Sequence, residues 1–297
     1  MFLKFFKSNQ PIIIFFIPIV AILLWLPNFL EPGNIVLQQQ LTMPFSQWIT
    51  HYLSSNLIIY HILAVIFNTA NALLINRINN QYILISDRTY LPAFIYLFLT
   101  AFIVTSPYNL FLFIAIFILL IVITRIFYIS TDKNLLNIFF ESGFLIGIGS
   151  LFSFNFWVFI FFIFITLMYL RSFFWREYAM VIIGLLTPFF FALVYYFLTD
   201  NISTFHQYIE KNLIAQHKFV LTLKGIIFYS VLTFVFIASV ISLNMNLNKK
   251  KIITRKYYKI FLWLTLLPVI AFFILPSITR DLFVFSSIPL AFICANF

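Results

Sequence analysis

The sequence has few charged residues, little glycine and only one cysteine. Charged residues make up 9% of the 297 positions, whereas hydrophobic residues make up 63%. A soluble domain of this length needs many more charges to cover its surface, so the composition excludes a soluble fold. The single cysteine, Cys294, excludes a disulfide framework and a cysteine-based metal site. We therefore expect an integral membrane protein and predict neither a metal nor a cofactor.

The few charges that are present are mostly positive, and the formal net charge is +10. Lysine and arginine lie at the ends of apolar runs instead of gathering in one basic patch. This distribution favours anchoring of the chain in a membrane over binding of nucleic acid. Membrane lipids are accordingly the predicted partners, and no nucleic-acid partner is predicted.

Ten apolar runs follow one another along the chain and predict an all-α, polytopic transmembrane bundle. Several runs are close to the lower limit of about 17 residues for crossing about 30 Å of hydrocarbon, so the predicted number of spans is eight to ten. We predict a single transmembrane domain over residues 1–297. The runs cover residues 11–26, 57–75, 91–106, 108–129, 136–151, 155–170, 178–198, 225–246, 260–276 and 282–297.

The orientation of the bundle follows from its most basic loop, Lys249–Lys259. Positive loops stay on the cytoplasmic side, and alternation of the spans then assigns every other loop. Both termini are predicted to be cytoplasmic, and 14 of the 18 lysines and arginines fall inside. The four that fall outside are Lys211, Lys218, Lys224 and Arg280.

Two longer polar segments, 28–56 and 199–224, lie on the predicted outer side and are expected to contain amphipathic helices. His206 and Glu210 have the i, i+4 spacing of a metal-binding pair, but such pairs are more often solvated, so no metal site is predicted. The outer side therefore carries the groups suited to acid–base chemistry. All four histidines fall there: His51, His61, His206 and His217.

Glu31 is the main candidate for catalysis. It follows the first span in an outer segment without lysine or arginine, which is the layout of polytopic sugar transferases that use lipid-phosphate donors. Glu31 would act as the base toward an acceptor hydroxyl, while Arg280, Lys211 and His61 would neutralise the departing phosphate. The alternative is that Glu31 caps a turn with Pro32 and Gly33.

Glu141 is the candidate for transport. It lies about two turns inside its predicted span, with Asn137 one turn behind it on the same face. An ionisable residue at such a depth suggests proton coupling in a transporter or flippase. The alternative is a packing role, because Gly143 and Gly147 follow in a G-x-x-x-G pattern that lets helices approach closely.

A third candidate site lies in the inner loop before the seventh run. Arg171, Trp175 and Arg176 combine positive charge with an aromatic ring at the membrane surface. They would anchor the loop among lipid headgroups or form a site for one anionic headgroup.

Several stretches resemble an uncharacterised family of polytopic inner-membrane proteins from Gram-negative bacteria. This resemblance implies a location in the bacterial inner membrane and gives no activity. Three hypotheses stay open: transfer of envelope-glycan or lipid-linked sugar on the outer face, transport or lipid flipping, and a non-catalytic role in membrane assembly. The similar stretches are FFKSNQP at 5–11, LWLP at 24–27, YLPAFIYLFLT at 90–100, RSFFWRE at 171–177, and the glycine and proline of Gly184 and Pro188.

Overall fold

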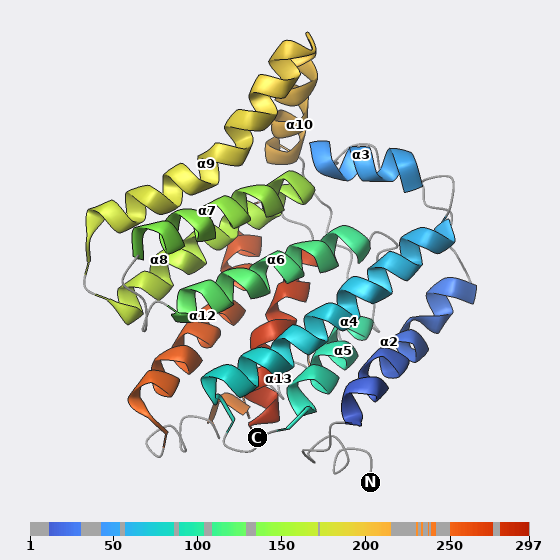
Figure 1. Cartoon of the computed structure of the whole chain (residues 1–297), viewed down its shortest axis with the longest axis vertical. Helices are drawn as coiled ribbons and strands as arrows, with labels where there is room; N and C mark the ends of the chain where they lie inside the picture. Colours follow the sequence, from blue (N-terminus) through green and yellow to red (C-terminus); the bar gives the residue numbers. More distant parts are fainter. Residues whose placement is uncertain are drawn as a thin grey trace.

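The fold is known from a computed structural model, shown in Figure 1. Every regular element in the described part of the chain is a helix, which confirms the predicted all-α class. The structure describes residues 12–30, 43–53, 57–85, 89–103, 109–128, 135–171, 173–214, 230, 233, 237, 239–241, 250–275 and 280–296.

The helices follow the order of the predicted apolar runs, with two additional amphipathic helices. They are α2 (Ile13–Leu30), α3 (Pro44–Leu53), α4 (Leu57–Tyr82), α5 (Leu91–Ile103), α6 (Asn109–Tyr128), α7 (Leu135–Phe152), α8 (Phe159–Leu170, after the 3-10 helix η1, Phe154–Val158), α9 (Trp175–Leu198), α10 (Ile202–Ile214), α12 (Ile252–Ile274) and α13 (Ser287–Ala295, after the 3-10 helix η2, Arg280–Ser286).

Five of the described helices, α4, α6, α7, α9 and α12, are long and apolar enough to cross a membrane. Shorter apolar helices occupy Ile13–Pro27, Leu91–Ile103, Phe154–Leu170 and Leu282–Ala295. The run predicted at 225–246 lies largely outside the described residues. Five membrane-spanning candidates support a membrane protein, and the number ten stays a prediction.

The two ends of the described chain lie at one end of the bundle. Figure 1 shows the start of α2 and the end of α13 at the same end as the start of α12. The Lys250 ammonium, just before α12, donates a hydrogen bond of 2.6 Å to the side-chain oxygen of Asn296 and another of 3.2 Å to the carbonyl of Leu84. Lys250 therefore links the start of α12 to the ends of α13 and α4.

In the described part of the chain, most of the positive residues also lie toward this end. Arg77, Arg125 and Arg171 lie near the ends of α4, α6 and α8, which Figure 1 shows on the same side as the start of α12. Lys211 lies on α10 at the opposite end. This asymmetry is the one expected of a membrane protein whose basic side is cytoplasmic.

Glycines bring α7 and α9 into backbone contact. A Cβ atom added at Gly143 would lie 2.1 Å from the carbonyl oxygen of Val181, and one at Gly184 would lie 2.3 Å from that of Phe140. These positions have no room for a side chain. The close packing predicted from the G-x-x-x-G pattern is confirmed.

Two helix boundaries were predicted incorrectly. Helix α12 begins at Ile252, so most of the basic stretch predicted as a loop forms its first turns, and α4 continues to Tyr82 instead of ending near residue 75. Some of the polar side chains in these extensions are buried: Asn79 is 1% exposed and Tyr258 is 0% exposed. Hydropathy alone assigns such residues to loops because it does not register burial against neighbouring helices.

The two segments predicted on the outer side meet each other. The Tyr208 hydroxyl of α10 donates a hydrogen bond of 2.5 Å to Gln47 of α3. The side-chain amide of Asn212 contacts the sulfur of Met43, and the Trp48 ring packs edge-on against Tyr195 of α9 at 5.2 Å between centroids. Helices α3 and α10 therefore contact each other at the end of the molecule where α9 ends.

Candidate functional site

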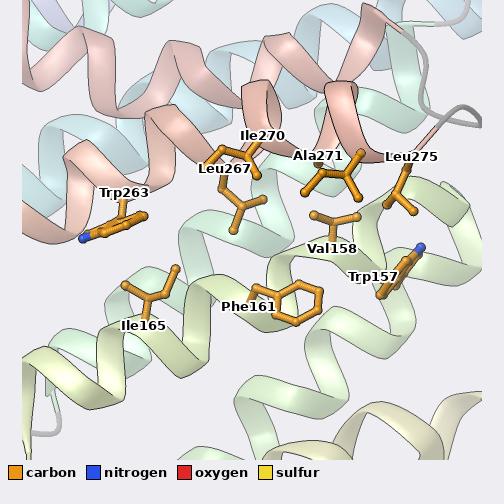
Figure 2. Close-up of a pocket in the computed structure, with 10 residues that line it drawn as sticks. Trp157, Val158, Phe161, Ile165, Trp263, Leu267, Ile270, Ala271 and Leu275 are labelled. Atoms are coloured by element: carbon orange, nitrogen blue, oxygen red, sulfur yellow. The ribbon is translucent and has the colours of Figure 1, made fainter.

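A half-open groove with a volume of about 340 Å³ lies between α12 and the segment formed by η1 and α8 (Figure 2). This volume is at the lower end of the range found for small-molecule sites. Its lining is entirely hydrophobic. Trp157, Val158, Phe161 and Ile165 line one side, and Trp263, Leu267, Ile270, Ala271, Ile274 and Leu275 line the other.

Helical spacing explains how the sequence builds this groove. Trp157, Phe161 and Ile165 are four residues apart, so they lie along one face of the chain from η1 into α8. On α12, Trp263 and Leu267 are also four residues apart and contribute to the opposite wall. The groove lies between these two rows of large side chains.

The groove has an aromatic residue at each end. Figure 2 shows Trp263 and Ile165 at one end and Trp157 and Leu275 at the other. The indole N–H of Trp263 donates a hydrogen bond of 2.9 Å to the Tyr169 hydroxyl of α8. Lys259 is exposed one helical turn before Trp263, on the same face of α12. At the Trp263 end, the apolar lining of the groove is therefore followed along α12 by the positive charge of Lys259.

The predicted headgroup residues lie where α8 ends and α9 begins. The Arg171 guanidinium is 2.8 Å from the carboxylate of Glu177, whose side chain is 8% exposed. Arg171 is therefore engaged in an ion pair within the protein. Trp175 and Arg176 are exposed, with the Arg176 guanidinium 6.0 Å from the centre of the Trp175 ring. Arg176 and Trp175 are thus the members of the predicted trio that face outward.

The transport candidate Glu141 forms an ion pair at the surface of the bundle. Its carboxylate lies 3.6 Å from the guanidinium of Arg125, and the two side chains are 48% and 54% exposed. Asn137, one turn earlier on α7, is also exposed. Neither Glu141 nor Asn137 is among the residues that line the groove.

The structure places only part of the predicted catalytic set. Glu31 lies outside the described residues, and Arg280 opens η2 with a side chain whose position is not described. His61 is buried on α4, with its ring 5.8 Å from that of Tyr60, whereas Lys211 is exposed on α10. Within the described part of the chain, no three histidine, cysteine or acidic residues are grouped so as to hold a metal ion.

Sequence reasoning missed two features that the structure reveals. One is the groove, for which the signal was the four-residue spacing of Trp157, Phe161 and Ile165. The other is a set of buried asparagines along α4, which a hydropathy reading treats as breaks in an apolar run. The buried asparagines are Asn68, Asn71, Asn76 and Asn79.

Comparison with known proteins identifies the family. Residues 41–297 match the profile of a family of unknown function, DUF6427. The chain belongs to DUF6427. The match extends from just before α3 to the end of the chain and includes both walls of the groove, whereas Glu31 precedes it. Neither a curated protein nor a solved structure matches the chain. Membership in DUF6427 agrees with the predicted resemblance to an uncharacterised family and leaves function to be argued from the site.

Proposed function

We propose that this chain is a multi-pass protein of the bacterial inner membrane that acts on a lipid-linked substrate, in the transfer of sugar to the cell envelope. The observation that carries this proposal is the apolar groove between α8 and α12. All ten residues that line the groove are hydrophobic, so it suits a hydrocarbon chain.

The position and shape of the groove support one extended hydrocarbon chain as the occupant. Its α12 wall runs from Trp263 to Leu275, a rise of about 18 Å along a helix. This wall lies almost entirely within a candidate membrane span, where the surrounding solvent is lipid. Ile270 and Ile274 on this wall are 45% and 70% exposed, so a chain could enter from the side.

The proposed chemistry takes place at the outer end of the bundle. The groove ends there at Leu275, and η2, which begins with Arg280, packs against α12. We assign Glu31 as the base and Arg280, Lys211 and His61 as partners of the lipid phosphate. The meeting of α3 and α10 at this end supports the assignment, because both segments predicted to carry outer polar groups are drawn together.

Lipid binding is tested first, by purifying the protein and measuring by mass spectrometry the lipids that remain bound. Ala271→Phe places a ring inside the groove and should remove most of the bound lipid-phosphate. Val269→Phe adds a ring on the same helix at a position that is 37% exposed and outside the groove lining, and should leave binding unchanged. Equal lipid content in both variants would refute the groove as the binding site.

Sugar transfer is tested separately with reconstituted protein and a radiolabelled polyprenyl-phosphate-linked hexose. Glu31→Gln should abolish transfer while the bound lipid stays, and Glu210→Gln, a change of an exposed glutamate on α10, should retain transfer. Lipid binding without transfer by the unmodified protein would favour the flippase or assembly alternatives over the enzyme.

The orientation is tested by fusing a reporter after Asn248, in the basic stretch before α12. A reporter that is active only in the cytoplasm should give a signal when it is fused at this position. A periplasmic signal would place the Glu31 side inside and contradict the proposed outer-face reaction.

A further inference from the structure

An ion pair on the surface of α6 and α7 lies within the candidate membrane spans. Arg125 belongs to the span Leu110–Tyr128, and Glu141 belongs to the span Leu135–Phe152. The two helices pack against each other, and the two charged side chains are 54% and 48% exposed. An exposed side chain on a membrane-spanning helix faces lipid, where a charge is costly unless a polar group compensates it. The pair is therefore placed to interact with a polar group of the membrane.

The two residues lie at the depth of lipid headgroups. Arg125 is three residues before the end of α6, about 5 Å along the helix axis, and Glu141 is six residues after the start of α7, about 9 Å along it. An arginine this close to the end of a span extends its long side chain toward the membrane surface. The polar groups that a bilayer offers at this depth are the phosphates and amines of its headgroups.

The geometry of the pair leaves both charges open to a ligand. The contact joins Nε of Arg125 to Oε2 of Glu141 at 3.6 Å, which is longer than a charge-assisted hydrogen bond. The pair of Arg171 and Glu177, by contrast, is closed at 2.8 Å, and the Glu177 side chain is 8% exposed. The first pair thus presents a positive and a negative group side by side at the surface, whereas the carboxylate of the second is enclosed by protein.

We propose that Arg125 and Glu141 bind the headgroup of an aminophospholipid, a zwitterion in which a short link joins a phosphate to a primary ammonium. The phosphate accepts hydrogen bonds from the Arg125 guanidinium, and the ammonium donates hydrogen bonds to the Glu141 carboxylate. Asn137, exposed one turn before Glu141 on α7, provides a neutral hydrogen-bonding group on the same face. The two charges of the ligand match the two charges of the site.

This charge pattern distinguishes the proposed ligand from other phospholipids. A headgroup that is only anionic would pair with Arg125 but bring negative charge toward Glu141. A quaternary ammonium has no N–H group, so it cannot donate a hydrogen bond to the carboxylate. Neither Arg125 nor Glu141 lines the groove between α8 and α12, so occupation of this site is independent of the proposed sugar transfer.

Native mass spectrometry of the purified protein with added phosphatidylethanolamine, phosphatidylcholine or phosphatidylglycerol of identical acyl chains tests the site. Phosphatidylethanolamine should bind about tenfold more tightly than phosphatidylcholine, because only its ammonium donates hydrogen bonds to the carboxylate. Glu141→Gln should abolish this preference. Glu210→Gln is the matched control, because it neutralises an exposed glutamate on α10 outside the candidate spans, and it should retain the preference. Arg125→Gln should weaken the binding of both lipids.

Three outcomes would overturn the proposal. The first is equal binding of phosphatidylethanolamine and phosphatidylcholine by the unmodified protein, or a preference that persists in Glu141→Gln. The second is tightest binding of phosphatidylglycerol that is lost in Arg125→Gln and kept in Glu141→Gln, which would assign Arg125 to an anionic headgroup. The third is binding of soluble glycerophosphoethanolamine as tight as that of the lipid, which would show that the ligand is a soluble compound.

Discussion

Two neighbouring helix pairs in this bundle are packed in opposite ways. Between α7 and α9, glycines allow the backbones to touch, and a Cβ atom at Gly147 would lie 2.6 Å from the Leu185 carbonyl oxygen. Between α8 and α12, the contact leaves a groove lined by tryptophan, phenylalanine and isoleucine side chains. Side-chain size at the helix contact thus distinguishes the pair whose backbones touch from the pair that leaves a groove, which we propose holds a lipid chain.

This difference has a physical basis in the membrane. Hydrocarbon surrounds the bundle, so apolar burial gives helices little reason to associate, and close packing becomes the main attraction. The α7–α9 pair has that packing. The α8–α12 pair leaves a groove, and the hydrocarbon chain that we propose there would supply further packing contacts.

The largest effect is expected when a side chain is added to the tight pair. Gly143→Ala places a methyl group against the Val181 backbone, which cannot move aside, and should destabilise the fold by about 3 kcal/mol or more. Gly149→Ala meets the side chain of Phe156 instead and should cost less, because a ring can shift. Thermal unfolding in detergent measures the loss of stability in both variants. If Gly143→Ala leaves the Tm unchanged, the backbone contact between α7 and α9 does not exist.

The next effect concerns the ion pair that joins the end of α8 to α9. Arg171→Gln leaves the buried Glu177 carboxylate without its partner and should cost about 2 kcal/mol. Arg125→Gln breaks the pair with Glu141, whose two side chains are half exposed, and should cost at most about 1 kcal/mol. A comparison of the two variants by thermal unfolding at neutral pH checks this ranking, and equal losses would contradict it.

A smaller effect is expected from Lys250, which holds the start of α12. Burial lowers the pKa of Lys250 to about 8. The unfolded chain therefore keeps this proton to a higher pH than the folded chain, and stability should rise as the pH increases from about 8 to about 10. Unfolding curves of the natural protein and of Lys250→Met across this range should differ in slope, since the variant lacks the titrating group. Parallel curves would show that Lys250 is solvated.

The smallest effect should come from the open pair. Trp263→Phe keeps a ring at the groove but removes the hydrogen bond to Tyr169 and part of the apolar surface of the indole, so the loss of stability should be about 0.5–1 kcal/mol. Tyr169→Phe removes the same bond from the other side. The double variant should lose no more than Trp263→Phe alone, and additive losses would show that the two residues act separately.

Much of the fold could be predicted from composition and hydrophobic runs. The positions of the apolar helices follow from them, and the G-x-x-x-G pattern located the tight pair. The beginning of α12 at Ile252 and the end of α4 at Tyr82 could not be predicted in this way. In both places polar residues are buried by helices distant in the sequence, and no local pattern records such contacts.

The sites were less predictable than the fold. Glu141 and Arg171 stood out in the sequence as rare charged residues, but their partners, Arg125 and Glu177, became evident only when neighbouring helices were placed side by side. Trp157 and Trp263 are far apart in the sequence and form one groove only through the packing of α8 against α12. The burial of the asparagines on α4 likewise depends on the packing of that helix against α5 and α6. The roles of Glu31 and Arg280 stay predictions.

The contact between α13 and α5 has a consequence for how the protein is made. These two helices pack together although α5 ends at Ile103 and α13 begins only at Ser287. The ribosome delivers α5 to the membrane long before α13, so α5 must wait there with one face uncovered. Assembly of the bundle is completed late, and during that interval the insertion machinery or surrounding lipid has to occupy the place that α13 will take.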